Sequence, residues 1–191
     1  MGFYSTGAFS NASQANRGVK KIKLTIKLLN ATGSGWFDGA KDLEEVEIHG
    51  IENSVVSGIN GSLFFYLPAL KRITGIVFDG ASANWTYATK NNPIYLPSSA
   101  LEEIRFVPNS MTYNGTYRFG QHGSLSSDSL VSIANAMDET NQTKQIELHA
   151  TASAKLSAIL GTVADGAFSL NASGNVTLLD FITNTKGWTI V

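Results

Sequence analysis

The string LEEVEIHG at residues 43–50 returns as LEEIRFVP at residues 101–108, and this repeated string decides the fold. Between the two copies, LKRITGIVF at residues 70–78 keeps the Leu-x-x-Ile opening and then carries extra residues near Gly75, which indicates a bulge. The leucines that open the three strings lie 27 and 31 residues apart. A repeat with this spacing indicates a fold built from successive similar units.

Each string alternates apolar and polar residues with the period of two that is typical of a half-buried β-strand. We predict neighbouring parallel strands of one sheet at residues 43–49, 70–78, 101–107, 144–149 and 188–191, with a strand at residues 20–28 at the N-terminal end. One face should be buried, because a single strand cannot hide its apolar side chains and stacking solves this problem. The residues expected on that buried face are Val46, Ile48, Ile104, Phe106, Ile146 and Leu148.

The pattern changes at residue 124, where apolar residues begin to recur with the period of a helix. A first helix should begin at an N-cap within residues 126–128, and a strand at residues 145–149 should follow it. Next we expect a short helix from Ser153 to Gly161, a third apolar-faced segment capped by Asn175, and a final strand. The chain is therefore predicted to have a strand-rich region at 1–123 and a helix-strand-helix-strand cap at 124–191, in one continuous fold.

These strings resemble the BspA-like leucine-rich repeats of surface proteins from gut and oral bacteria and of phage-encoded structural proteins. The resemblance covers roughly residues 40–110, and the segments 130–137, 147–152 and 182–190 look like the terminal module that accompanies such repeats. The chain departs from the family in its irregular spacing and in lacking the cysteine often seen in the repeat. The expected fold is an irregular leucine-rich-repeat-like α/β solenoid with a mainly parallel sheet.

The resemblance implies adhesion or recognition by the surface of the repeats, without catalysis. The expected setting is a tail-associated virion protein of a phage or prophage, and the alternative is a bacterial cell-surface adhesin. Both settings are extracellular, on a virion or on a bacterial surface. The expected partners are a protein or a cell-surface glycan, together with other virion proteins or further copies of the chain.

Composition excludes several classes of partner. The 14 Lys and Arg residues are balanced by 15 Asp and Glu residues, so the net charge of −1 provides no field that would attract nucleic acid. The longest apolar stretch, at residues 63–67, has about a quarter of the length that crosses a bilayer, so no membrane insertion is expected. The absence of cysteine removes disulfides, thiolate metal sites and thiol nucleophiles.

Catalytic and metal-binding motifs are missing from the sequence. It contains neither a nucleophile elbow nor a glycine-rich phosphate loop, so we expect no enzyme; a fragment of a carbohydrate-active enzyme is the alternative. His49, His122 and His149 occupy separate segments without the spacing of metal-ligating histidines. We therefore expect no metal site and no cofactor.

Two surfaces are candidates for binding. The first is the outward face of the sheet, where stacked strands would hold polar side chains in rows about 4.8 Å apart. Its candidate residues are Glu45, Glu47, His49, Glu103, Arg105, Gln145, Glu147 and His149.

The second candidate surface consists of aromatic residues in loops, which can stack on sugar rings or fill a partner's pocket. Its candidate residues are Trp85, Tyr87, Tyr95, Tyr113 and Tyr117. Solvated strand positions and loop anchors explain the same residues without a ligand.

The pair Asn-x-Ser/Thr occurs eight times, against about three expected from composition. We interpret these pairs as turn residues, because Asn accepts left-handed backbone angles and hydroxyl groups close small turns. N-glycosylation is the alternative. The positions are Asn11, Asn30, Asn60, Asn84, Asn114, Asn141, Asn171 and Asn175.

Overall fold

The computed structural model describes residues 18–25, 37, 40–49, 55–56, 67–81, 100–139 and 144–191. Within them the chain is a mixed α/β protein with short parallel sheets, few helices and no closed barrel. The strands are β1 (Lys21–Thr25), β2 (Glu45–His49), β3 (Val55–Val56), β4 (Arg72–Thr74), β5 (Val77–Phe78), β6 (Thr116–Phe119), β7 (Gln145–Leu148), β8 (Leu160–Ala164), β9 (Ala167–Leu170), β10 (Val176–Thr177) and β11 (Thr189–Ile190). The helices are α1 (Ser127–Ala136), α2 (Ala150–Lys155), α3 (Leu178–Asp180) and the π-helix Phe181–Thr185.

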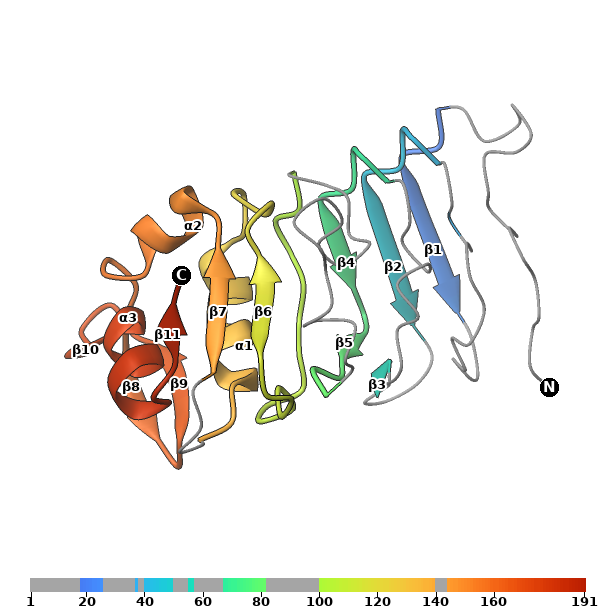
Figure 1. Ribbon diagram of the computed structural model, residues 1–191. Coiled ribbons are helices and arrows are strands. Elements are labelled where there is room, and N and C mark those ends of the chain that lie inside the picture. The colour runs from blue at the N-terminus through green and yellow to red at the C-terminus, as the bar shows by residue number, and fades with distance from the viewer. Residues whose placement is uncertain are drawn as a thin grey trace.

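Two groups of parallel strands follow one another along the molecule, as Figure 1 shows. β1, β2 and β4 pair in that order, so that Lys21, Glu45 and Arg72 occupy the same position in neighbouring strands. An isolated bridge continues this row from Arg72 to Glu103. β6, β7 and β11 form the second group, with β7 in the middle. The parallel pairing predicted for the repeated strings is therefore confirmed.

The prediction of one continuous sheet is wrong, because β7 pairs with β6 and not with residues 101–107. Serine side chains of α1 form hydrogen bonds along the other edge of residues 101–107, the edge that does not face β4. The backbone N–H groups of Ile104 and Phe106 donate to the hydroxyl oxygens of Ser129 and Ser132 over 3.1 and 2.8 Å. These hydroxyl groups satisfy the donors that a neighbouring strand would otherwise use, so the parallel pairing stops there.

A single hydrophobic core includes the inward side chains of the parallel strands. The six residues predicted for the buried face are all buried: Val46, Ile48, Ile104, Phe106, Ile146 and Leu148. The leucines that open the three strings, Leu43, Leu70 and Leu101, belong to the same cluster. Each repeated string therefore supplies one buried leucine followed by alternate buried side chains.

The C-terminal segment differs from the predicted helix-strand-helix-strand order. α1 begins after Ser126, whose hydroxyl oxygen accepts from the N–H of Ser129, as the N-cap pattern predicted. β8 and β9 then form an antiparallel hairpin, with β10 as a third strand, where a helix end and a polar turn were expected. The hairpin turn contains Asp165 and Gly166, whose φ angles of 50° and 71° suit a two-residue connection. The Asp-Gly pair was thus the sequence signal for this hairpin.

Side-chain hydrogen bonds fix the last elements in place. Thr177 caps α3 in place of the expected Asn175, because its hydroxyl oxygen accepts from the N–H of Asp180 over 3.0 Å. The side-chain amide of Asn135 in α1 accepts from the N–H of Phe168 in β9 and donates to its carbonyl oxygen, over 2.8 and 2.9 Å. α1 thereby satisfies backbone groups of the hairpin and holds it against the core.

Candidate functional site

The candidate site is the outward face of the parallel strands, to which the period of two assigns every second residue. In β2 the apolar side chains are buried, whereas Glu45 and Glu47 alternate with them on the opposite side. The register then places Lys21 of β1 and Arg72 of β4 directly beside Glu45. The sign of the charge therefore alternates from one strand to the next.

A network of ion pairs crosses β1, β2 and β4. The Glu45 carboxylate lies 2.8 Å from Nζ of Lys21 and 2.8 Å from Nη2 of Arg72. Hydrogen bonds from these two groups, with Lys21 first, lower the pKa of Glu45. Glu47 is held in the same way by Lys23 at 3.0 Å and by Lys21 at 3.1 Å. Because each carboxylate is paired with two cations, these side chains are restricted before any partner binds.

The cations lie outermost on this face. The side chain of Lys23 is 59% exposed against 16% for Glu47, and that of Arg72 is 44% exposed against 18% for Glu45. The tips of the long cationic side chains therefore cover the carboxylates and present hydrogen-bond donors to solvent. The face offers a partner a regular array of donors with little net charge.

A further row of ion pairs lies at the start of the strands. Glu44 pairs with Lys71 at 2.8 Å and with Lys20 at 2.9 Å. Hydrogen bonds from these lysines, with Lys71 first, lower the pKa of Glu44 from 4.5 to about 2. Glu44 therefore remains ionised well below the pH at which an exposed glutamate takes up a proton.

We expect the Glu44 carboxyl to titrate near pH 2 when its side-chain carbon is followed by NMR. A pKa that is depressed by folding means that the pairs stabilise the fold above the unfolded pKa of 4.5, and this contribution is lost as the pH falls toward 2. Lys71→Met should return the pKa toward 4.5, whereas Lys155→Met in α2 should leave it unchanged. A wild-type pKa near 4.5 would contradict this row of ion pairs.

The second group of strands continues the same chemistry with fewer charges. Arg118 of β6 pairs with Glu147 of β7. Beside them, the hydroxyl of Thr116 donates to Oε1 of Gln145 over 2.9 Å. The predicted face residues Gln145 and Glu147 are therefore each joined to the neighbouring strand.

Arg105 belongs to residues 101–107, a segment that lies between the two groups of strands in Figure 1, and its side chain is held loosely. Its guanidinium is 3.8 Å from the Glu103 carboxylate, and its side chain is 58% exposed. Its backbone carbonyl accepts from the N–H of Phe78 over 2.8 Å, which fixes the main chain while the side chain extends into solvent. Among the described cations of this face Arg105 has the longest ion pair, so it is the best placed to contact a partner.

His149, which was predicted to lie on the sheet face, follows the last residue of β7 and is not part of that strand. Its ring Nδ1 accepts from the N–H of Thr151 over 3.1 Å, and His149 is the N-cap of α2. The backbone of His49 lies in β2 opposite Thr25, while its side chain falls outside the described part of the structure. The assignment of these two histidines to the face stays a prediction.

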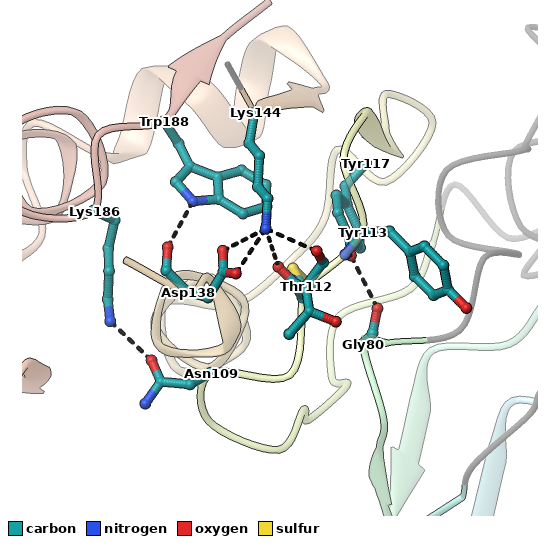
Figure 2. Close-up of polar contacts among 10 residues, drawn as sticks. Gly80, Asn109, Thr112, Tyr113, Tyr117, Asp138, Lys144, Lys186 and Trp188 are labelled. Carbon is teal, nitrogen blue, oxygen red and sulfur yellow. Dashed lines mark hydrogen bonds and ion pairs between the residues drawn. The ribbon is translucent and has the colours of Figure 1, made fainter. Parts of the chain in front are cut away.

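The predicted loop aromatics differ in their surroundings: one is exposed, one is buried, and the others lie outside the described residues. Tyr113 is exposed beside β6. Tyr117 was wrongly assigned to a loop, since it lies in β6 with its ring fully buried, and burial raises the pKa of its hydroxyl. That hydroxyl donates to the carbonyl oxygen of Gly80 over 3.1 Å, as Figure 2 shows. The remaining candidates lie outside the described residues: Trp85, Tyr87 and Tyr95.

Two buried lysines, both drawn in Figure 2, were not singled out by the sequence. Lys144 is 1% exposed, and its Nζ lies 2.7 Å from both carboxylate oxygens of Asp138. The indole N–H of Trp188 donates to the backbone carbonyl of the same aspartate over 3.0 Å. Lys186 is buried to the same extent and donates to Oδ1 of Asn109 over 3.0 Å. Lysine is almost never fully buried unless it is paired, and nothing in the sequence distinguishes these two from surface lysines.

Comparison of the chain with models of known protein families, with curated proteins and with solved structures finds no match. Within the described ranges, no three side chains of His, Asp or Glu are grouped so that they could hold a metal ion. No helix in those ranges combines the length and the apolar character that a membrane crossing requires. The candidate site therefore rests on the geometry of the strands.

Proposed function

We propose that the chain is a non-enzymatic binding and structural module, built as an irregular leucine-rich-repeat-like solenoid, that recognises an anionic partner with the outward face of its strands. The observation that carries this proposal is the array of Lys and Arg tips above ordered carboxylates. Because the ion pairs already restrict these side chains, little further side-chain entropy is lost when a partner binds.

The solenoid part of the proposal is supported by the register of the strands. Leu43, Leu70 and Leu101 are buried at equivalent positions before segments that pair in parallel. Stacked units of this kind share a continuous core and create an extended surface, which is the surface that repeat proteins use for binding.

An acidic protein surface or an anionic cell-surface glycan fits this face best. Guanidinium groups bind carboxylates through two parallel hydrogen bonds, and lysines supply further donors. The carboxylates beneath offset most of the positive charge, so attraction to a partner is short-ranged. A partner would therefore be selected by the spacing of its acceptors more than by long-range steering.

The setting that we propose is the surface of a phage or prophage particle, in association with its tail. The resemblance of the repeated strings to such proteins supports this setting, and the cysteine-free composition suits it. The chain should then be found in particles by mass spectrometry and should contact other virion proteins or further copies of itself. A monomer that is absent from particles would favour the cell-surface adhesin.

Replacing Arg105 with glutamine should weaken partner binding at least about tenfold, which corresponds to about 1.4 kcal/mol. The change removes an exposed guanidinium and leaves the backbone pairing with Phe78 intact. The probes are a glycan array that carries anionic and neutral glycans, and immobilised polyglutamate as a mimic of an acidic protein surface. Binding is measured as the apparent affinity of the labelled chain for each probe.

Lys41→Gln provides the comparison, because it also removes one positive charge from an exposed side chain, in the turn before β2. This variant should bind like the wild type. Equal losses in the two variants would show that general charge and not the strand face is responsible. Absence of wild-type binding to both probes, or a preference for neutral glycans, would refute the proposed function.

A further inference from the structure

One buried lysine lies beside an amide and not directly on a carboxylate. Lys186, which follows the π-helix, is 1% exposed, and its Nζ is 3.0 Å from Oδ1 of Asn109 and 3.4 Å from Oε1 of Glu139. The centre of the Phe181 ring lies 5.5 Å from the same nitrogen. Figure 2 shows the Lys186 side chain pointing at Asn109. An amine, an amide and a carboxylate thus meet, although 77 residues separate Asn109 from Lys186.

This arrangement differs from that of the other buried lysine. Nζ of Lys144 is bound by both carboxylate oxygens of Asp138 at 2.7 Å. For Lys186 the nearer group is a neutral amide, while the Glu139 carboxylate is farther away and its side chain is 57% exposed. A buried ammonium is stabilised most by close contact with a carboxylate, so ion pairing alone does not explain where Lys186 lies.

The main chain at Asn109 is fixed by its conformation and by a hydrogen bond. Asn109 has a φ of 54°, in the left-handed region that asparagine adopts more readily than most residues. Its N–H donates to the carbonyl oxygen of Asn135 over 2.9 Å. The main chain at Asn109 is therefore fixed, and its side-chain Oδ1 lies 3.0 Å from Nζ of Lys186. Bringing two groups into contact lowers the entropy cost of a reaction between them.

We propose that Lys186 and Asn109 become joined by an intramolecular isopeptide bond. The Glu139 carboxylate accepts a proton from the Lys186 ammonium, and the neutral Nζ attacks Cγ of Asn109. The Nζ–Cγ bond forms and the Cγ–Nδ2 bond breaks. Of the two protons that Nζ loses, Glu139 passes one to the leaving nitrogen, which departs as ammonia, and releases the other to solvent. No oxidant or reductant takes part, and one amide replaces another.

The surroundings suit this reaction. Lys186 is buried against an aromatic ring, which keeps water from the amine, whereas Asn109 and Glu139 reach solvent, where ammonia can leave. The bond would tie the turn after residues 101–107 to the end of the π-helix. It would close a loop that contains most of the C-terminal segment, in a chain that has no cysteine for a disulfide.

The intact mass of the folded wild-type chain tests the proposal. It should lie about 17 Da below the mass of the sequence, which is the loss of one ammonia. Trypsin does not cleave after a modified lysine, so digestion should yield a branched product that joins residues 106–118 to residues 156–191. Glu139→Gln should slow the mass loss about a hundredfold or more, because the proton acceptor is removed.

Lys186→Arg keeps the positive charge but cannot form the bond, so this variant should retain its full mass. Asn109→Gly, which keeps a residue that accepts positive φ, is a second variant with the same expected result. These variants also identify cyclisation at Asn114, which precedes Gly115 in the same tryptic peptide and releases ammonia as well. A mass loss that persists in both variants would overturn the proposal, as would full mass of the wild type after prolonged incubation in the folded state.

Discussion

Replacing Asp138 with asparagine is expected to lower the free energy of unfolding by about 3 kcal/mol, because it leaves the Lys144 ammonium buried without a counterion. Both oxygens of the carboxylate lie 2.7 Å from Nζ, and Lys144 is 1% exposed. The carbonyl oxygens of Met111 and Thr112, at 3.3 and 3.0 Å, contact the ammonium but carry no full charge. Urea denaturation followed by circular dichroism measures the change.

Glu147→Gln shows what the same chemical change costs near the surface. Its ion pair with Arg118 joins side chains that are 32% and 31% exposed, so solvent screens it and the expected loss is less than about 1 kcal/mol. Combining Asp138→Asn with Lys144→Met should recover part of the stability, since the unpaired charge is then removed. Similar losses from the two carboxylate changes would mean that burial does not strengthen the Lys144 pair.

The buried pattern of the strands could be predicted because the period of two is a local property. Val46 and Ile48 alternate with charged residues, and the strand must bury them whichever strand it pairs with. The identity of the neighbouring strand is not local. Pairing stops at residues 101–107 because hydroxyl groups of Ser129 and Ser132 reach their backbone, and no pattern within that segment reports this.

For the candidate face, too, the local features could be predicted and the contacts between strands could not. The alternation predicted that Glu45 and Glu47 point outward, but the cations that order Glu45 lie 24 residues before it and 27 residues after it. The ion pairs therefore depend on the register between strands, which the sequence does not state. The burial of Lys144 and Lys186 is harder still to predict from the sequence, because a buried lysine depends on hydrogen-bond and charge partners that are distant in the chain.

Replacing Gly75 with alanine is expected to destabilise the fold by about 3 kcal/mol or more, for two reasons that add. Gly75 has a φ of 79°, and the left-handed region costs other residues about 1–2 kcal/mol. A β-carbon at Gly75 would also lie 1.9 Å from the backbone oxygen of Ile48, so β2 and the segment between β4 and β5 would have to move apart. Forcing atoms into a packed region of this kind costs about 1–3 kcal/mol.

Gly18→Ala separates these two contributions. Gly18 has a φ of 86°, but nothing lies within 4 Å of the position that its β-carbon would take, so only the backbone cost of about 1–2 kcal/mol applies. Urea denaturation should therefore show a clearly larger loss for Gly75→Ala, with faster amide hydrogen exchange in β2 and β4. Equal losses would mean that backbone angle alone explains Gly75. A larger loss would mean that the extra residues near Gly75 are tolerated in the repeat because a glycine lets the chain pass against the carbonyl of Ile48.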